Sequence, residues 1–349
     1  MAGFPYDSIE EPIVKRLIQG VLVIGVGGGG DVVGAIHIYL WMKRLGANTL
    51  LASIPWERFS IDPVPGPIGI DEVVGGKIIG NYAMLVNGNE YVIRNKRRII
   101  PQGVRVAKVL KTKVALIDAS HGEKGLRKGI EELCTSMGLD TTIGIDVGGD
   151  IVAKGHEDNL WSPLMDALAL AAIANSSVYG LIGIHSIGAD GELDINITLS
   201  RISEIIKHGG LVGIYGLCRT DITVLSEILK HAETEASSIA YLAAKGFIGF
   251  KDIRLSTRKV NITPYSMVTF LVDARILYQL SPLAQVLTGT EDIREARERL
   301  NNIHVYTELD LEEDLYPLLK AGRKLTKEVI LEIYRKGVKR VKDKSTSIH

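Results

Sequence analysis

A run of glycines that directly follows a short apolar segment constrains the fold of this chain more than any other feature. Val21–Val26 is an apolar run, and the glycine-rich turn Gly25–Gly34 begins where that run ends. From Asp31 to Leu45 the apolar residues recur at helical spacing, and Gly46 ends the pattern. A strand that leads through a glycine turn into a helix is the opening unit of a Rossmann-like α/β fold.

Later segments repeat the alternation of strand and helix. The predicted strands are Asn48–Ile54, Val114–Ile117, Thr142–Val147, Val178–Ile184 and Leu211–Tyr215, and helical stretches such as Trp161–Ala174 separate them. Hydrophobic residues make up 46% of the chain but aromatic residues only 6%, so the core must be mainly aliphatic, as in buried parallel strands. We therefore predict an α/β protein with a mainly parallel, doubly wound sheet.

Turn and cap signals add detail to this prediction. Asn87-Gly88 lies between the apolar segments Tyr82–Val86 and Tyr91–Arg94, which predicts a hairpin within an antiparallel insertion near residues 78–100. Ser162-Pro163 and Ser281-Pro282 each predict a helix that begins with a serine N-cap followed by proline.

The domain prediction is a single α/β domain over residues 1–320, followed by a basic C-terminal helix and tail over residues 321–349. Lys plus Arg and Asp plus Glu both number 41, so net charge gives no reason to expect a nucleic-acid or membrane partner. Met1–Glu11 lacks the apolar core of a secretory signal, and Cys134 and Cys218 lack the spacing of a disulfide framework or a zinc site. A cytoplasmic protein is expected, and these features permit a homo-oligomer.

The glycine turn is a candidate ligand site. Its glycines fit G-x-G-x-x-G, in which backbone amides and a helix N-terminus approach a phosphate, so Gly27, Gly28, Gly29 and Gly30 are predicted ligand-binding residues. Asp31 at the helix start would repel that phosphate unless a cation lies between them. The competing interpretation is a structural turn capped by Asp31.

A plain nicotinamide site fits less well, because it needs an acidic residue at the end of the second strand to bind the ribose. Ser53-Ile54-Pro55 occupies that end, and Glu57 comes late. A Walker P-loop is excluded, because no Gly-Lys-Ser/Thr follows the glycines.

Acidic residues recur at the ends of the predicted parallel strands, where α/β proteins form their ligand crevice. They are Asp118, Asp146, Asp150, Asp190, Glu192 and Asp194. Carboxylates that share one crevice need a hard cation, so Asp31, Asp146, Asp150 and Asp190 are predicted to hold Mg²⁺ or Mn²⁺. Asp146, Asp150 and Asp190 are also candidate catalytic residues, and Gly148 and Gly149 would allow a ligand to approach the backbone. The competing interpretation is that each Asp caps the helix that follows it.

Other side chains could complete such a site. His121 follows a predicted strand and could act as a general base. Glu57, Arg58, Glu192, Glu235 and Arg254 are candidate ligand-binding residues, the arginines for an anionic group of the ligand. The stretch Ile93–Lys113 holds eight basic and no acidic residues, a pattern that most often marks a solvated surface.

Several of these segments together resemble a family of uncharacterised prokaryotic proteins, best represented in archaea, that is catalogued as a domain of unknown function. The matching stretches are Gly27–Asp31, Trp56–Arg58, Asp146–Asp150, Ser162–Ala167, Asp190–Leu193, Thr234–Ser237, Ser281–Ala284 and Thr307–Asp310. They extend over most of the chain, which implies one family-wide unit. The resemblance implies no particular reaction.

The leading functional hypothesis is a metal-dependent enzyme, a transferase or hydrolase, that acts on a nucleotide or a phosphorylated small metabolite at the C-terminal ends of the parallel strands. One alternative is an NAD(P)- or flavin-dependent oxidoreductase that uses the glycine turn. The other is a nucleotide-binding regulatory protein without catalysis.

Overall fold

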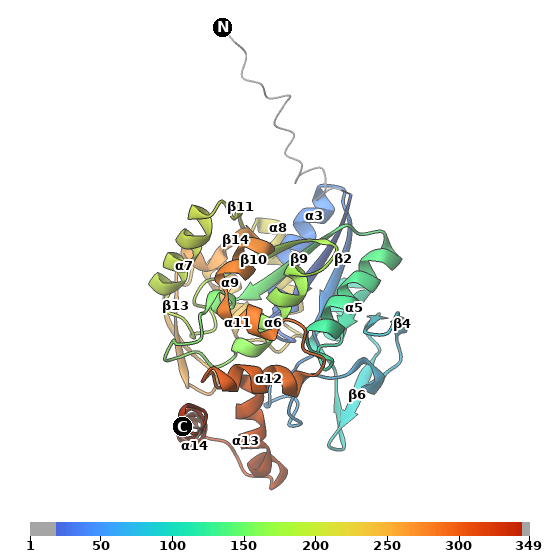
Figure 1. Cartoon of the computed structure of the whole chain (residues 1–349). Helices are drawn as coiled ribbons and strands as arrows, with labels where there is room; N and C mark the ends of the chain where they lie inside the picture. The colour runs from blue at the N-terminus through green and yellow to red at the C-terminus, as the bar shows by residue number, and fades with distance from the viewer. Residues whose placement is uncertain (1–18, 344–349) are drawn as a thin grey trace.

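The chain is described here over residues 19–343 of a computed structural model. The expectations for Met1–Glu11 and for the tail Ser345–His349 concern residues outside that range. Within it, the largest sheet has nine strands, in the spatial order β11 (Leu211–Gly216), β14 (Val268–Asp273), β10 (Tyr179–His185), β9 (Thr141–Val147), β1 (Gly20–Gly25), β2 (Asn48–Ser53), β8 (Val114–Ile117), β5 (Ala83–Val86) and β4 (Lys77–Ile79). Figure 1 shows this sheet at the centre of the molecule.

The centre of the sheet is parallel, as predicted. Strands β10, β9, β1, β2 and β8 pair with their neighbours in parallel register, and Gly25 at the end of β1 lies level with Ser53 of β2 and Ile145 of β9. The strands β14 and β5 run antiparallel to these neighbours at the two sides. The Rossmann-like, mainly parallel architecture is therefore confirmed.

Helices cover both faces of the sheet, which makes it doubly wound. One face packs against α5 (Gly122–Met137), α6 (Pro163–Ala174), α7 (Ile195–Lys207), α10 (Ala274–Leu280), α11 (Pro282–Leu287) and α12 (Ile293–Asn302). The other packs against α2 (Asp31–Gly34), α3 (Ile36–Arg44), α4 (Gln102–Leu110) and α8 (Arg219–Ile228). The alternation along β1 feeds both cores, since Leu22 and Ile24 point to the first face and Val21 and Val23 to the second.

Smaller elements complete the fold. Strands β3 (Val73–Val74), β6 (Tyr91–Arg94) and β7 (Arg97–Ile99) form one small sheet, and β12 (Gly249–Ile253) and β13 (Arg258–Ile262) form another that packs on α9 (Ala236–Ala244). Short 3-10 turns are η2 (Ile70–Glu72), η3 (Asp150–Val152) and η4 (Pro264–Met267), and the chain continues through α13 (Glu308–Lys320) and α14 (Lys327–Asp343). None of the helices within residues 19–343 combines the length and the apolar character needed to cross a membrane.

The antiparallel insertion near residues 78–100 is present, but its hairpin turns are not where the sequence suggested. Asn87-Gly88 connects two sheets instead of two paired strands, because β5 pairs with β4 and β8 while β6 pairs with β3 and β7. The carboxylate of Glu90 accepts hydrogen bonds from the amides of Asn87, Gly88 and Asn89, which fixes this connection as a compact loop. The β6–β7 hairpin turns instead at Asn95 and Lys96, both with positive φ.

The two predicted serine caps have different outcomes. Ser281 caps α11 as expected, since its hydroxyl accepts a hydrogen bond from Ala284 N. Ser162 is the N-cap residue of α6 and Pro163 follows it, as predicted, but the Ser162 hydroxyl makes no capping hydrogen bond and donates to Glu192 instead. The amides at the start of α6 are instead bound by the carboxylate of Glu308, which accepts from Leu164 N at 3.0 Å and Met165 N at 2.8 Å.

The basic C-terminal helix α14 is solvated on one side only. Its buried residues include Ile330, Tyr334 and Val341. Tyr334 stacks on Trp161 with ring centroids 3.8 Å apart, and its hydroxyl donates to Leu160 O at 3.0 Å. The helix thus contributes to the wall around the start of α6.

Two buried histidines tie α3 to the sheet. Gly34 O can only accept, so His37 Nδ1 donates to it at 2.7 Å, and His37 Nε2 then accepts from the hydroxyl of Thr269 at 2.6 Å. The same hydroxyl oxygen accepts from His185 Nδ1 at 2.8 Å. Burial lowers the pKa of His37 to about 4 and lowers the pKa of His185 as well, so both rings are neutral at pH 7.

Replacing Thr269 by valine is expected to lower the free energy of unfolding by about 2 kcal/mol, because two buried ring nitrogens lose their partner. Urea denaturation measures the change. Thr223→Val, at an exposed position of α8, removes only an intrahelical bond to Arg219 O and should change stability by less than about 0.5 kcal/mol. Equal effects of the two substitutions would contradict the role given to Thr269.

Candidate functional site

The candidate site lies at the topological switch point of the sheet, where successive strands begin to be added on the other side of β1. From β1 the chain adds β2 and β8 on one side, and then β9 and β10 on the other. The loops after β1 and β9 therefore diverge at their carboxyl ends, which is where open α/β sheets bind ligands. The glycine turn follows β1, and Asp146–Asp150 lies at the end of β9, so the two strongest sequence signals meet at this point.

Close packing accounts for the glycines of the turn. A Cβ on Gly25 would lie 2.2 Å from Val32 N, so the strand and the helix start can approach only with glycine here. Gly28 has a φ of +139°, which L side chains rarely adopt. A Cβ on Gly27 would lie 2.6 Å from an oxygen of Asp31 and 3.0 Å from one of Asp166, so the turn runs directly over carboxylates.

A cavity of about 330 Å³ opens above the turn. Gly27–Asp31 and the loop Trp56–Ile61 line it, with Asp150 and Asp190 from the strand ends. The predicted ligand residues Glu57, Arg58, Glu235 and Arg254 line it as well. The structure therefore brings most of the predicted site residues to one cavity.

Three carboxylates form a compact group at the floor, which we call the acidic triad: Asp31, Asp146 and Asp166. One oxygen of each lies within 4.8 Å of the others. Asp31 begins α2, Asp146 lies in β9, and Asp166 lies in the first turn of α6. Asp31 and Asp166 reach the cavity surface, and Asp146 lies behind them, not among the described residues that line it.

The hydrogen bonding of the triad is incomplete. Asp31 Oδ2 accepts from Gly27 N and Val147 N, both at 3.1 Å. Neither oxygen of Asp146, which is 1% exposed, makes a hydrogen bond of good geometry in the described part of the chain, although weaker contacts with Asp150 and Gly149 N slightly lower its pKa; Asp166 Oδ1 has no partner there either. Buried carboxylate oxygens are normally paired, so these atoms retain lone pairs with which a cation could be coordinated.

The electrostatics agree with that interpretation. Burial raises the pKa of Asp31 to about 7. Burial and the neighbouring charge of Asp31 raise the pKa of Asp146, and burial with the charge of Asp146 does the same for Asp166. Without a cation the triad must hold protons near neutral pH, and a bound divalent cation would remove both the repulsion and the protons.

A second acidic group differs in character. Asp150, Asp190 and Glu192 also place one oxygen each within 4.8 Å of one another. Glu192 accepts from Trp161 N, Ser162 N and Arg254 Nη1, at 2.7, 2.9 and 2.6 Å. Burial alone would raise its pKa, but Arg258 and Arg254 lower it to about 2. Glu192 is thus a charged anchor for arginine and not an open ligand position.

Asp190 is less well satisfied than Glu192. Its Oδ1 accepts from Glu192 N at 3.2 Å, whereas Oδ2 is buried without a partner among residues 19–343. Burial and the charge of Glu192 raise the pKa of Asp190 to about 6. A cavity-lining carboxyl with this pKa can accept a proton near neutral pH.

Arg254 reaches the cavity from a strained turn between β12 and β13. Arg254, Leu255 and Ser256 have φ values of 54°, 54° and 61°, and left-handed backbone costs roughly 1–2 kcal/mol for each such residue. Arg254 N donates to Glu235 Oε2 at 2.9 Å, and Glu235 also lies 3.8 Å from Arg58 Nη1. Half-exposed Glu235 thus holds the backbone of Arg254 and faces the guanidinium of Arg58, while the guanidinium of Arg254 pairs with Glu192 at 2.6 Å. The two guanidinium groups at the cavity favour an anionic ligand there.

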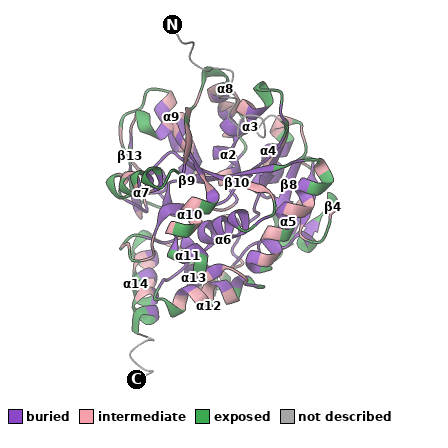
Figure 2. Cartoon of the chain, turned by 45° about the horizontal axis from the view of Figure 1, so that its top comes forward, coloured by how far each residue is buried: buried purple, intermediate pink, exposed green. Residues whose placement is uncertain are grey.

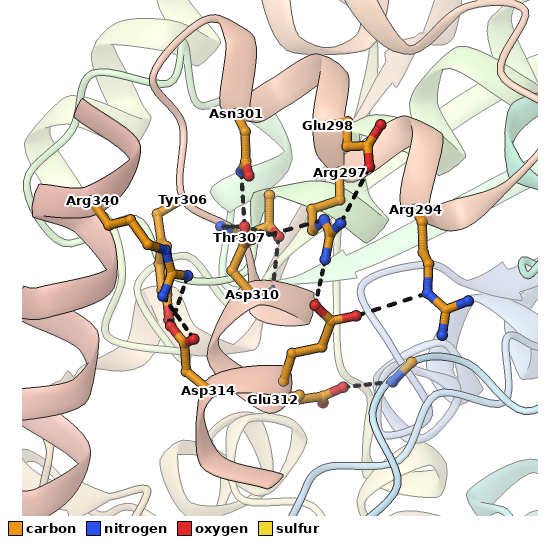
Figure 3. A network of polar contacts seen from close by, with 12 residues as sticks. Arg294, Arg297, Glu298, Asn301, Tyr306, Thr307, Asp310, Glu312, Asp314 and Arg340 are labelled. Carbon is orange, nitrogen blue, oxygen red and sulfur yellow. Dashed lines mark hydrogen bonds and ion pairs between the residues drawn. The ribbon is translucent and has the colours of Figure 1, made fainter. Parts of the chain in front are cut away.

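Helix α13 closes another side of the cavity with Glu308, Leu311 and Glu312. Figure 3 shows how it is fixed between its neighbours: Asp310 accepts from Asn301 at 2.9 Å and Asp314 from Tyr306 at 2.9 Å. Arg340 of α14 forms two bonds of 2.9 Å with Asp314. The network joins α12, α13 and α14 into one wall.

Five predicted site residues are not among the described residues that line the cavity: Asp146 and Glu192, described above, and His121, Gly148 and Gly149. His121 is exposed at the start of α5. Side chains of the protein pack against the two glycines and leave no room for a ligand. A Cβ on Gly148 would lie 2.3 Å from Asp190 Cγ, and a Cβ on Gly149 would lie 2.8 Å from a methyl group of Thr198.

Sequence reasoning missed Asp166, Arg258 and Glu308. Asp166 is the only charged residue in α6, which is otherwise apolar and buried along its whole length (Figure 2). A lone carboxylate in such a helix is costly unless it has a function or a partner, so this was a usable signal. The stretches Ser162–Ala167 and Thr307–Asp310, which carried the family resemblance, contain two of the three missed residues.

Comparison with known proteins identifies the family and no relative of known function. A family model described as "Protein of unknown function (DUF1152)" matches residues 22–316. This range includes the acidic triad, the cavity-lining residues Arg58 and Arg254, and most of α13. No curated protein and no solved structure matches the chain. The resemblance noted in the sequence is thereby confirmed.

Proposed function

This chain belongs to the DUF1152 family, and we propose that it is a metal-dependent enzyme that acts on a nucleotide or a phosphorylated small metabolite. The observation that carries the proposal is the acidic triad. Asp146 keeps both carboxylate oxygens buried, without a hydrogen bond of good geometry among the described residues, beside Asp31 and Asp166, at the carboxyl ends of parallel strands. Mg²⁺ or Mn²⁺ prefers such oxygen ligands and completes its shell with water and substrate phosphate.

The residues around the triad suit a phosphate group. The amides of Gly28 and Gly30 donate no hydrogen bond within the described residues, so they are available to phosphate oxygens. Arg58 offers positive charge at the mouth, and Arg254, which Glu192 holds in place, lines the cavity beside it. A metal ion at the triad would neutralise the phosphate charge next to Asp31, which otherwise opposes binding at the helix start.

The same arrangement supplies groups for chemistry. We assign Asp190 as the general base that takes a proton from an attacking water or hydroxyl, because the residue lines the cavity, one of its oxygens has no partner among the described residues, and its pKa lies near 6. Asp150, whose pKa burial raises, would hold a proton beside it. The reaction class is phosphoryl or nucleotidyl transfer, or metal-assisted hydrolysis. Both cysteines are free thiols, which suits the cytoplasmic location that we also propose.

The nicotinamide alternative gains one observation, because Glu57 does reach the glycine turn. It is less favoured, since a dinucleotide pyrophosphate lies at the start of the first helix. Here that helix, α2, spans only Asp31–Gly34 and begins with a carboxylate of the triad. The third hypothesis, binding without turnover, uses the same cavity and is separated from the first by a search for product.

A thermal-shift panel tests the proposal. We expect Mn²⁺ with a nucleoside diphosphate, near 100 times the dissociation constant, to raise the melting temperature by roughly 4–8 °C. Pyrophosphate without metal should give little effect. A shift with NAD(P) that does not need metal would favour the oxidoreductase, and no shift with any metal–phosphate pair would contradict the proposal.

A further inference from the structure

The carboxylate of Glu57 contacts the glycine turn at a second place, away from the triad. A Cβ on Gly29 would lie 2.5 Å from Glu57 Oε1, so glycine is required here to admit the carboxylate. Glu57 is 3% exposed and lines the cavity. It accepts a hydrogen bond from Gln102 N at 2.8 Å on Oε1, and a carboxylate has further lone pairs for a ligand.

A short backbone detour brings Glu57 to this position. After β2, Trp56 N donates to Ile54 O at 2.9 Å, and Gly29 N then donates to Trp56 O at 2.9 Å. The loop is thus hydrogen-bonded to the glycine turn itself. Glu57 therefore occupies the place at the end of the second strand where nucleotide-binding α/β proteins hold ribose hydroxyls, although it comes late in the sequence.

The spacing along the turn limits the ligand. Gly27 lies against Asp31 and Asp166 of the triad, and Gly29 lies against Glu57. Because Gly27 and Gly29 are only two positions apart in the chain, their Cα atoms lie at most about 7.6 Å from each other. A ligand that places phosphate at the triad would thus present its next chemical group, such as the sugar of a nucleotide, to Glu57.

The cavity wall beyond Glu57 is apolar. Phe59 and Ile61 follow it in the same loop, line the cavity and are only partly buried. Trp161 is less available for stacking, because Tyr334 and the guanidinium of Arg258 lie over its ring at 3.8 and 4.2 Å. A base next to the sugar would therefore meet Phe59 and Ile61.

We propose that the substrate is a ribonucleotide, with its phosphate at the acidic triad and the glycine turn and its ribose hydroxyls bound by Glu57. This assignment rests on the proposed function and narrows it, since a phosphorylated metabolite without a vicinal diol would leave Glu57 without a ligand. Glu57 is a specificity-determining residue in this account, because it contacts the sugar and not the reacting phosphate.

Calorimetric titration in the presence of Mn²⁺ tests the assignment. The probes are ADP, GDP, CDP and UDP, their 2′-deoxy and 3′-deoxy forms, and inorganic pyrophosphate. For the wild type we expect at least one ribonucleoside diphosphate to bind about tenfold or more tightly than a deoxy form, since a polar site discriminates against a missing hydroxyl. In Glu57→Gln, which can still accept from Gln102 N, that ratio should fall below about threefold while the affinity for pyrophosphate is retained.

The outcomes separate the two proposals. Equal binding of ribo and deoxy forms with Mn²⁺ would overturn the ribose assignment and leave the proposed function intact. A ribose preference that persists in Glu57→Gln would overturn the role of Glu57. If no phosphate compound binds with Mn²⁺, both proposals fail. Glu233→Gln, a change of an exposed carboxylate that also lines the cavity, is the matched control and should keep the preference.

Discussion

Replacing Asp146 by asparagine is expected to make the metal-free protein more stable and to remove its response to divalent cations. At pH 8 the wild-type carboxylate is buried, makes no hydrogen bond of good geometry among residues 19–343 and lies next to Asp31 and Asp166. Asparagine keeps the shape and removes the charge. We expect the free energy of unfolding to rise by about 2 kcal/mol at pH 8, because without a cation the buried carboxyl must either stay charged beside Asp31 and Asp166 or take up a proton, and both cost free energy.

The loss of the cation response is the larger effect. Removing one of three charged ligands should abolish the stabilisation by millimolar Mn²⁺ that we expect for the wild type. Urea denaturation at 25 °C with and without Mn²⁺ measures both quantities. Asp140→Asn, at the opposite and exposed end of β9, is the control and should change neither. An Asp146→Asn protein that is less stable and still responds to Mn²⁺ would contradict the account.

The second large effect is a dependence of stability on pH, of which a cation should reverse the part that the triad contributes. The folded-state pKa values of Asp31, Asp190 and Glu308 are raised to about 7, 6 and 8, above the value near 4 of an unfolded carboxyl, chiefly by burial. The folded protein then binds protons that the unfolded chain has released. This stability is fully present below pH 4 and is lost as the pH rises through 6 to 8.

Histidine acts in the opposite sense. The lowered pKa of His37 gives stability that is present above pH 6.5 and is lost as the pH falls toward 4. The buried carboxyls together change the stability with pH more than this histidine does, since Glu57 and Glu312 also have pKa values raised to about 7. We therefore expect the metal-free protein to lose at least about 3 kcal/mol of stability between pH 5.5 and pH 8.

Cations and protons compete for the same carboxylates, so the stabilisation by Mn²⁺ should be largest at pH 8 and small at pH 5.5. Urea denaturation at pH 5.5 and at pH 8, each with and without Mn²⁺, gives the four free energies of unfolding that the comparison needs. A cation effect that is equal at both pH values would show that the ion binds elsewhere, at groups that do not titrate in this range.

The sequence predicted the core of the fold because its strongest signals are local. The apolar runs that became β1 and β9, with glycines and carboxylates directly after them, define strand ends without knowledge of the neighbours. Their convergence followed from the general rule for parallel sheets. The prediction for Asn87-Gly88 failed because a turn motif does not show which strands pair, and here Glu90 folds it into a connection between two sheets.

The rest of the site depends on contacts between distant segments. Asp166 joins the triad because α6 packs across the sheet, and Glu308 joins the site because α13 meets the start of α6. Arg258 joins it because the β12–β13 pair places it beside Glu192. Glu57 was judged too late in the sequence for a ribose site. The bend at Ile54–Trp56, which returns it to Gly29, rests on single backbone hydrogen bonds that no residue pattern reveals.

The most direct test of the central claim is an anomalous difference map from a crystal of the protein grown with Mn²⁺. The account predicts one ion about 2.1 Å from oxygens of Asp31, Asp146 and Asp166, below the glycine turn. An ion bound only at Asp150, Asp190 and Glu192, or no ion in the cavity at a saturating concentration, would contradict it.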